Sequence, residues 1–149
     1  MAILESGIIF DGVTVVAREY YSSNTTLDKN LRAGLLSAIS GFAKEAFSDN
    51  IESFSMSNYE VVCLVRSVPV PGEESDATMM VFAIVEKGTN PRTVKKNLKK
   101  IADAFLNRYS MLDVRKGELT YFEPFGERMD TIFKDLRLKS EDRLKRALF

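Results

Sequence analysis

The fold is decided by one stretch of the chain, ATMMVFAIVEKG at residues 77–88, whose side chains are apolar without a break from Met79 to Val85. A strand with one solvated face alternates apolar and polar side chains, so an unbroken run predicts a strand that is covered on both faces. The stretch YEVVCLVRSV at residues 59–68 contains a similar run and predicts a second inner strand. Helices are therefore expected to cover both faces of the sheet.

The flanking segments predict three further strands. The segments AILESGIIF and VTVVAREYY, at residues 2–10 and 13–21, are rich in strand-forming residues, and Asp11 and Gly12 lie between them. An Asp-Gly pair in this position favours a β-hairpin, because a type I′ turn needs positive φ at both central residues. The segment IESFSMS at residues 51–57 alternates large apolar residues with serine, which is typical of a half-exposed edge strand.

The first expected helix lies between the hairpin and the edge strand. The segment GLLSAISGFAKEAFSDN at residues 34–50 carries apolar residues at spacings of three and four, which predicts a broad apolar stripe along a helix. Thr25 or Thr26 is its expected N-cap, and the helix is expected to end near Phe47.

Two more helices are expected after the inner strands. Asn90 or Thr89 can cap a helix that begins at Pro91, because proline is favoured at the first helical position. Its expected core stripe consists of Val94, Leu98, Ile101, Ala102, Phe105 and Tyr109. A third helix is expected to begin at Pro124 and to bury Phe125, Met129, Ile132, Phe133 and Leu136.

The remaining segments complete a single α+β domain over residues 1–149. Residues 110–123 are expected to be irregular or briefly extended, and residues 139–149 to form a short terminal helix. The element order is β-β-α-β-β-β-α-α, and the simplest arrangement places the first helix on one face of the sheet and the next two on the other. A chain of 149 residues is long enough to bury a substantial core in one domain.

This element order, the length and the hairpin start resemble a longin domain, in the broader longin and roadblock group with SNARE-like and profilin-like sheets. The resemblance implies a five-stranded antiparallel sheet in the order 2-1-5-4-3. It also implies that the domain pairs through its first helix and the adjacent edge strand, and that such pairs form platforms for small Ras-like GTPases. The chain shows no heptad coiled coil of the kind found in longin-type SNARE proteins, so membrane fusion is not expected.

Composition and charge exclude several classes of protein. The chain is 45% hydrophobic and 28% charged, and no apolar run approaches the ~20 residues that span a bilayer. One cysteine suits a reducing compartment, so a cytoplasmic location is expected, with peripheral contact at membranes as an alternative. Residues 1–75 contain 5 Lys and Arg and 10 Asp and Glu, which gives a net charge of −5. Residues 76–149 contain 16 Lys and Arg and 11 Asp and Glu, which gives a net charge of +5.

The sequence offers little for catalysis. It contains no histidine, the commonest general base near neutral pH, and no glycine-rich phosphate loop. Cys63 lies within an apolar strand, and the acidic run at residues 73–76 is interpreted as a solvated loop. The chain is therefore expected not to be an enzyme and to bind no cofactor or metal. An enzyme that uses the thiol or these carboxylates is the alternative.

A basic cluster lies on the expected second helix. Helical geometry places Arg92, Lys95, Lys96 and Lys99 within one ~100° sector, and Lys100 lies beside it. The cluster is interpreted as a solvated face, or as a contact for an acidic partner or an anionic membrane. Nucleic acid is not expected as a partner, because no aromatic residue is interleaved with these lysines.

A second candidate surface combines the first helix with the edge strand. The outward side of the helix is small rather than charged, which allows close approach, and an edge strand can extend its sheet into a partner. The candidate residues are Ser37, Ser40, Gly41, Lys44, Ser53, Phe54, Ser55 and Met56. The alternative interpretation is an ordinary exposed helix face for Ser37, Ser40 and Gly41, and plain core positions for Phe54 and Met56.

These observations lead to three hypotheses. The first is a non-enzymatic interaction module that forms homo- or heterodimers, with a small GTPase or another longin or roadblock domain as partner, in trafficking-type or polarity-type assemblies. The second is a peripheral membrane adaptor that uses the basic helix. The third is a roadblock-like dimer that regulates a GTPase.

Overall fold

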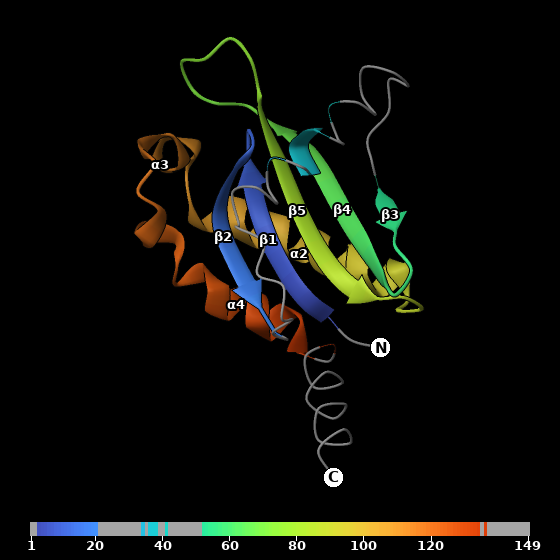
Figure 1. Ribbon diagram of the computed structural model, residues 1–149. Helices are drawn as coiled ribbons and strands as arrows, with labels where there is room; N and C mark the ends of the chain where they lie inside the picture. The colour runs from blue at the N-terminus through green and yellow to red at the C-terminus, as the bar shows by residue number, and fades with distance from the viewer. Residues whose placement is uncertain are drawn as a thin grey trace.

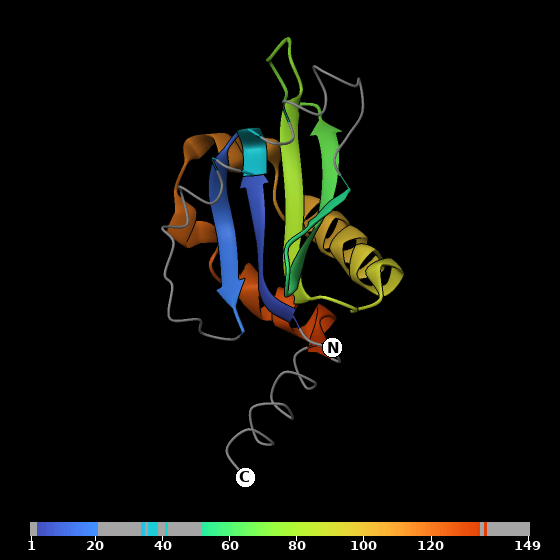
Figure 2. The same ribbon diagram turned by 45° about the vertical axis from the view of Figure 1, so that its right-hand side comes forward.

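The computed structural model describes residues 3–20, 34, 36–38, 41, 52–134 and 136. Five strands form one antiparallel sheet in the order β2-β1-β5-β4-β3. Figures 1 and 2 show α2 and α4 together on one side of this sheet. The predicted fold class, including the sheet order implied by the resemblance, is confirmed.

The opening hairpin joins β1 (Ile3–Phe10) to β2 (Val13–Glu19). Asp11 and Gly12 have φ angles of 46° and 85°, as the predicted turn requires. The turn is also tied to β5, because the backbone N–H of Thr78 donates to Asp11 Oδ1 at 2.8 Å. This contact fixes the hairpin against the centre of the sheet.

The inner strands are β4 (Tyr59–Val68) and β5 (Ala77–Glu86), and the edge strand is β3 (Ser53–Ser55). β5 pairs with both β1 and β4, so it lies at the centre of the sheet. Every side chain from Met79 to Ala83 is at most 3% exposed, which confirms coverage on both faces. β3 is confirmed as an edge, although it is shorter than the expected residues 51–57.

The larger core lies between the sheet and two helices, α2 (Pro91–Arg108) and α4 (Phe125–Ile132). Asn90 caps α2, and its Oδ1 accepts from the backbone N–H of Arg92 at 3.0 Å. All six residues of the predicted α2 stripe are buried. The ring of Phe105 lies at the centre of an aromatic cluster that contains Phe10, Tyr109, Phe122 and Phe125.

The expectation of irregular structure over residues 110–123 is wrong. The segment forms α3 (Met111–Lys116) and the short 3-10 helix η1 (Leu119–Phe122). Ser110 and Asp113 form a reciprocal capping box, and Gly117 ends α3 with a φ of 76°. A helix of six residues is too short to produce a clear hydrophobic period, which is why its caps were the better signal.

A smaller core lies on the opposite face of the sheet. The described residues of the first predicted helix (Gly34, Leu36, Ser37, Ala38 and Gly41) are helical, and Figures 1 and 2 show this segment on the side away from α2. Leu36 packs there with Ile9, Val61, Cys63, Met80 and Phe82. The predicted cap at Thr25 or Thr26, the end near Phe47 and the terminal helix over 139–149 lie outside the described residues.

Candidate interaction surfaces

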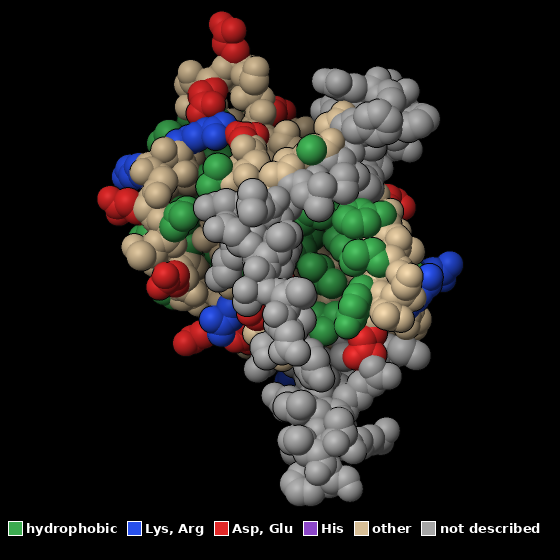
Figure 3. Space-filling view, in the orientation of Figure 1, with side chains coloured by type: hydrophobic (Ala, Val, Ile, Leu, Met, Phe, Trp, Pro, Cys, Tyr) green, Lys and Arg blue, Asp and Glu red, His purple; other side chains and the backbone are tan. Residues whose placement is uncertain are grey.

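Several apolar side chains near β3, on the sheet face that is turned away from α2, are half-buried or exposed. Strand pairing aligns Phe54, Val61 and Ile84 across β3, β4 and β5, so these three side chains share that face. Met56 and Tyr59 continue the face at the β3–β4 turn and are 45% and 40% exposed. We call the β3-side apolar face the set formed by Phe54, Met56, Tyr59, Val65 and Ile84. Figure 3 shows apolar side chains gathered over β4 and β5 on this side.

Among the described strands, β3 is paired on one side only, and its residues Ser53 and Ser55 are exposed. The N–H of Cys63 donates to the carbonyl of Glu52, and the N–H of Met56 donates to the carbonyl of Tyr59, both at 2.8 Å. Because hydrogen-bonded pairs alternate along an antiparallel ladder, the backbone groups of Ser53 and Ser55 point away from β4. No other described strand lies beyond β3. The strand therefore offers a short row of donors and acceptors beside the β3-side apolar face.

The residues predicted for the outward side of the first helix do not all lie on that side. Gly41 is exposed, whereas Ser37 is half-buried and lies towards the β1–β2 turn. A Cβ placed on Gly12 would lie 3.8 Å from Ser37 Oγ, so Ser37 is on the flank of the helix rather than on its outer side. Ser40 and Lys44 lie outside the described residues.

The residues of the predicted basic face differ in their burial and in their ion pairs. Lys95 is half-buried and forms an ion pair with Glu52 at 3.3 Å, beside β3. The other predicted cations, Arg92, Lys96, Lys99 and Lys100, are exposed. Within the part of the chain that the structure describes, none of these four forms an ion pair.

A groove between α2 and α4 brings Lys100 together with Arg108 and Arg128, two cations that sequence analysis did not select. We call it the α2–α4 groove; it has a volume of about 530 Å³ and is lined by Lys100, Asp103, Ala104, Asn107, Arg108, Arg128 and Ile132. Asp103 is already paired with Arg66, at 2.8 Å. Arg108 and Arg128 come together only when α2 and α4 pack side by side, so no local pattern could have joined them.

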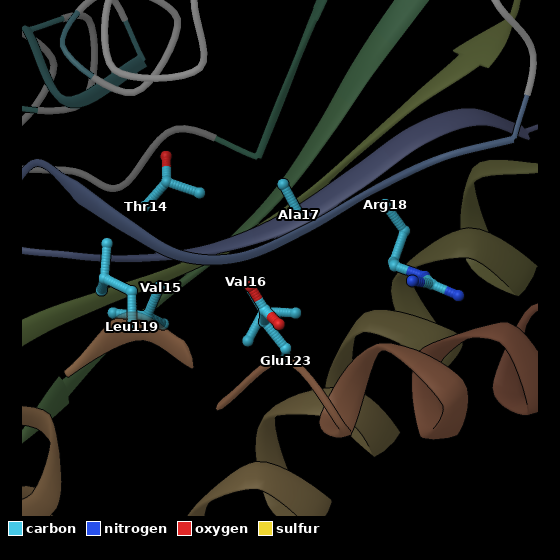
Figure 4. A pocket seen from close by; sticks show the side chains of 7 residues that line it. All are labelled: Thr14, Val15, Val16, Ala17, Arg18, Leu119 and Glu123. Carbon is cyan, nitrogen blue, oxygen red and sulfur yellow. The ribbon is translucent and has the colours of Figure 1, made fainter. Parts of the chain in front are cut away.

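A second hollow lies beneath the edge strand β2. It has a volume of about 460 Å³ and is lined by Thr14, Val15, Val16, Ala17, Arg18, Leu119 and Glu123. Figure 4 shows Leu119 beside Val15 and Glu123 beside Val16, with Arg18 at the far end. Arg18 is engaged structurally, because Nε and Nη2 donate to the two carboxylate oxygens of Asp130 at 3.1 and 2.5 Å. This hydrogen-bonded pair raises the pKa of Arg18.

Two groups considered for catalysis are the Cys63 thiol, which is buried, and the Glu73 carboxylate, which is held in an ion pair. Cys63 is fully buried, and desolvation raises the pKa of its thiol to about 11, so the thiol stays protonated near neutral pH. Glu73 in the acidic loop accepts from Arg115 at 2.9 Å, and Arg115 also donates to Asp11 at 2.8 Å. The loop is therefore tied to α3 and the hairpin. Among the described residues, no cluster of His, Cys, Asp and Glu could hold a metal ion.

Comparison of this chain with models of protein families, with curated proteins and with solved structures finds no match. Of the helices that the structure describes, none combines the length and the apolar character needed to span a bilayer.

Proposed function

We propose that this chain is a non-enzymatic interaction module that docks a partner along β3 and the β3-side apolar face. The observation that carries the proposal is the outward backbone of Ser53 and Ser55 beside the exposed side chains of Met56 and Tyr59. A partner strand can form hydrogen bonds with the backbone of β3 and bury the side chains of Met56 and Tyr59. Sheet edges recognise extended segments in this way.

The energies of these two contributions favour docking. Fully burying a large apolar side chain contributes about 1.5–3 kcal/mol, and Met56 and Tyr59 still have 45% and 40% of their surface to bury. Each new backbone hydrogen bond contributes about 1 kcal/mol net. Neither contribution alone offsets the loss of translational freedom on association, so the backbone and apolar contacts must act together.

The resemblance to longin domains supplies the class of partner. We propose that the chain pairs with a second longin-like domain, its own copy in the simplest case, and that the pair scaffolds or regulates a small Ras-like GTPase. The resemblance rests on element order, and the sheet order and helix placement of the structure support it. Trafficking-type or polarity-type assemblies are the setting that this class of partner suggests.

The GTPase part of the proposal is tested by a pull-down with purified Ras-like GTPases, each loaded with GDP and with a non-hydrolysable GTP analogue. We expect wild-type protein to retain a GTPase and the double variant Met56→Glu, Tyr59→Glu to retain less, because the variant weakens the pair. Leu112→Glu is a matched control, since Leu112 is 53% exposed on α3, away from β3. Failure of wild-type protein to retain any GTPase, with either nucleotide bound, would overturn the GTPase assignment. It would not test the docking surface, which is tested by the solution mass of the chain.

A further inference from the structure

We infer that the α2–α4 groove binds an acidic polypeptide segment, at a site separate from the β3-side apolar face. The two surfaces lie on opposite sides of the sheet, because α2 and α4 cover one face and the β3-side apolar face belongs to the other (Figures 1 and 2). The groove could therefore be occupied while the chain is paired through β3.

The described residues that line the groove carry a net positive charge. They include Lys100, Arg108 and Arg128, while the one carboxylate among them, on Asp103, is held by Arg66. Arg108 is also oriented, because the carbon of its guanidinium lies 5.3 Å from the centroid of the Tyr109 ring. These cations have no anionic partner within the described part of the chain. These cations would therefore attract an anion that binds in the groove, and no existing ion pair would have to break.

The shape of the positive surface favours a chain over a single small anion. Lys100 and Arg108 are eight residues apart on α2, which is about 12 Å along the helix at 1.5 Å per residue, and Arg128 lines the same groove from α4. An extended segment of about four residues has the same length. A segment rich in Glu or Asp could therefore contact all three cations at once.

The floor of the groove adds an apolar element. Ala104 of α2 and Ile132 of α4 are among the residues that line it. A segment whose acidic residues are interrupted by a small or aliphatic one would place its carboxylates on the cations and its apolar side chain on this floor. Charge complementarity then supplies register, and the apolar contact supplies part of the affinity.

One feature argues against an anionic membrane as the occupant. Among the described residues, the large apolar side chains that are exposed lie on β2, β4, α3 and η1 and in the β3–β4 turn, and none belongs to α2 or α4. A membrane contact here would have no side chain to insert.

The test is a fluorescence-anisotropy titration of the full chain into a short labelled peptide of glutamate interrupted by leucine. The decisive variant is Arg108→Glu with Arg128→Glu. The matched control is Lys87→Glu with Lys116→Glu, which changes the net charge equally; Lys87 Nζ donates to the carbonyl of Met56 at 3.4 Å, and Lys116 ends α3. Both variants alter exposed side chains, so both are expected to fold, which circular dichroism checks.

We expect the groove variant to bind the peptide about thirty-fold more weakly than wild type, because each reversal replaces an exposed attraction by a repulsion. We expect the control to change affinity less than three-fold, and wild-type binding to weaken as salt is raised. Equal weakening in both variants, or none in either, would overturn the inference. Binding to phosphatidylserine vesicles without binding to the peptide would overturn it in favour of a membrane.

A second measurement keeps the inference testable if a variant fails to fold. Titration of the same peptide into isotope-labelled wild-type protein should shift the backbone amide signals of Ala104 and Asn107 in NMR spectra, and leave those of Ser53 and Ser55 unchanged. Shifts confined to residues outside α2 and α4 would contradict the assignment of the groove. Binding in the groove does not require pairing through β3, so the outcome of this experiment does not depend on the proposed dimer.

Discussion

Gly126 and Arg18 provide a prediction in which one substitution has opposite effects in two backgrounds. Arg18 extends from β2 across α4 to reach Asp130, and it passes directly over Gly126. A Cβ at Gly126 would lie 2.7 Å from Arg18 Cδ and 3.0 Å from Arg18 Nε, which is too close for both groups to stay in place. Gly126→Ala should therefore displace the Arg18 side chain from Asp130.

The expected magnitudes follow from two opposing contributions. Replacing a helical glycine by alanine stabilises a helix by about 0.5–1 kcal/mol. Loss of the bidentate pair should cost about 1–2 kcal/mol, above the usual value for an exposed pair because Asp130 is only 16% exposed. In wild type, Gly126→Ala should then lower the free energy of unfolding by up to about 1.5 kcal/mol. In an Arg18→Ala background it should raise it by about 0.5–1 kcal/mol.

The assay is urea denaturation of wild type, the two single variants and the double variant, followed by circular dichroism. The coupling between the two sites should be about 1 kcal/mol or more, with the sign of the Gly126→Ala effect reversed. Equal effects of Gly126→Ala in both backgrounds, within about 0.3 kcal/mol, would refute the reasoning. That result would mean that Arg18 moves aside without losing Asp130.

Three further predictions concern the hairpin, the core and the thiol. Gly12→Ala should lower the free energy of unfolding by about 1–2 kcal/mol in urea denaturation, because Gly12 has a φ of 85°; an unchanged midpoint would contradict this. Phe105→Ala should lower it by about 3–5 kcal/mol, because the ring is fully buried at the centre of the aromatic cluster, and a loss below about 1 kcal/mol would contradict that account. Burial raises the pKa of Cys63 from 9.0 to about 11, so the folded chain holds the thiol proton more tightly than the unfolded chain. The stability of wild type should therefore fall as pH rises from 9 towards 11, more steeply than that of Cys63→Ala; parallel pH profiles would contradict the assignment.

Local signals in the sequence were sufficient for the framework of the fold. The unbroken run in β5 indicated a central strand because only a strand covered on both faces tolerates it. The Asp11–Gly12 turn and the cap at Asn90 were readable because each depends on a few neighbouring residues. α3 was missed because it is only six residues long, and its capping box at Ser110 was the signal that should have been used.

The candidate surfaces depend on packing, which the sequence does not show. Helical spacing correctly placed Arg92 and Lys96 on the solvent side of α2, but it could not show that Lys95 bends towards β3 to meet Glu52. The contribution of Arg128 to the α2–α4 groove depends on how α4 lies beside α2. The alternation in residues 51–57 did indicate the edge strand, whereas the pairing that turns Ser53 outward came from the structure.

The central claim is that a partner docks along β3 and the β3-side apolar face. The most direct measurement is solution mass by light scattering over a concentration series, for wild type and for the double variant Met56→Glu, Tyr59→Glu, with Leu112→Glu as control. The account predicts a dimer for wild type and for the control at high concentration, and a monomer for the double variant throughout. A wild-type monomer at every concentration, or a dimer that the double variant leaves intact, would contradict it.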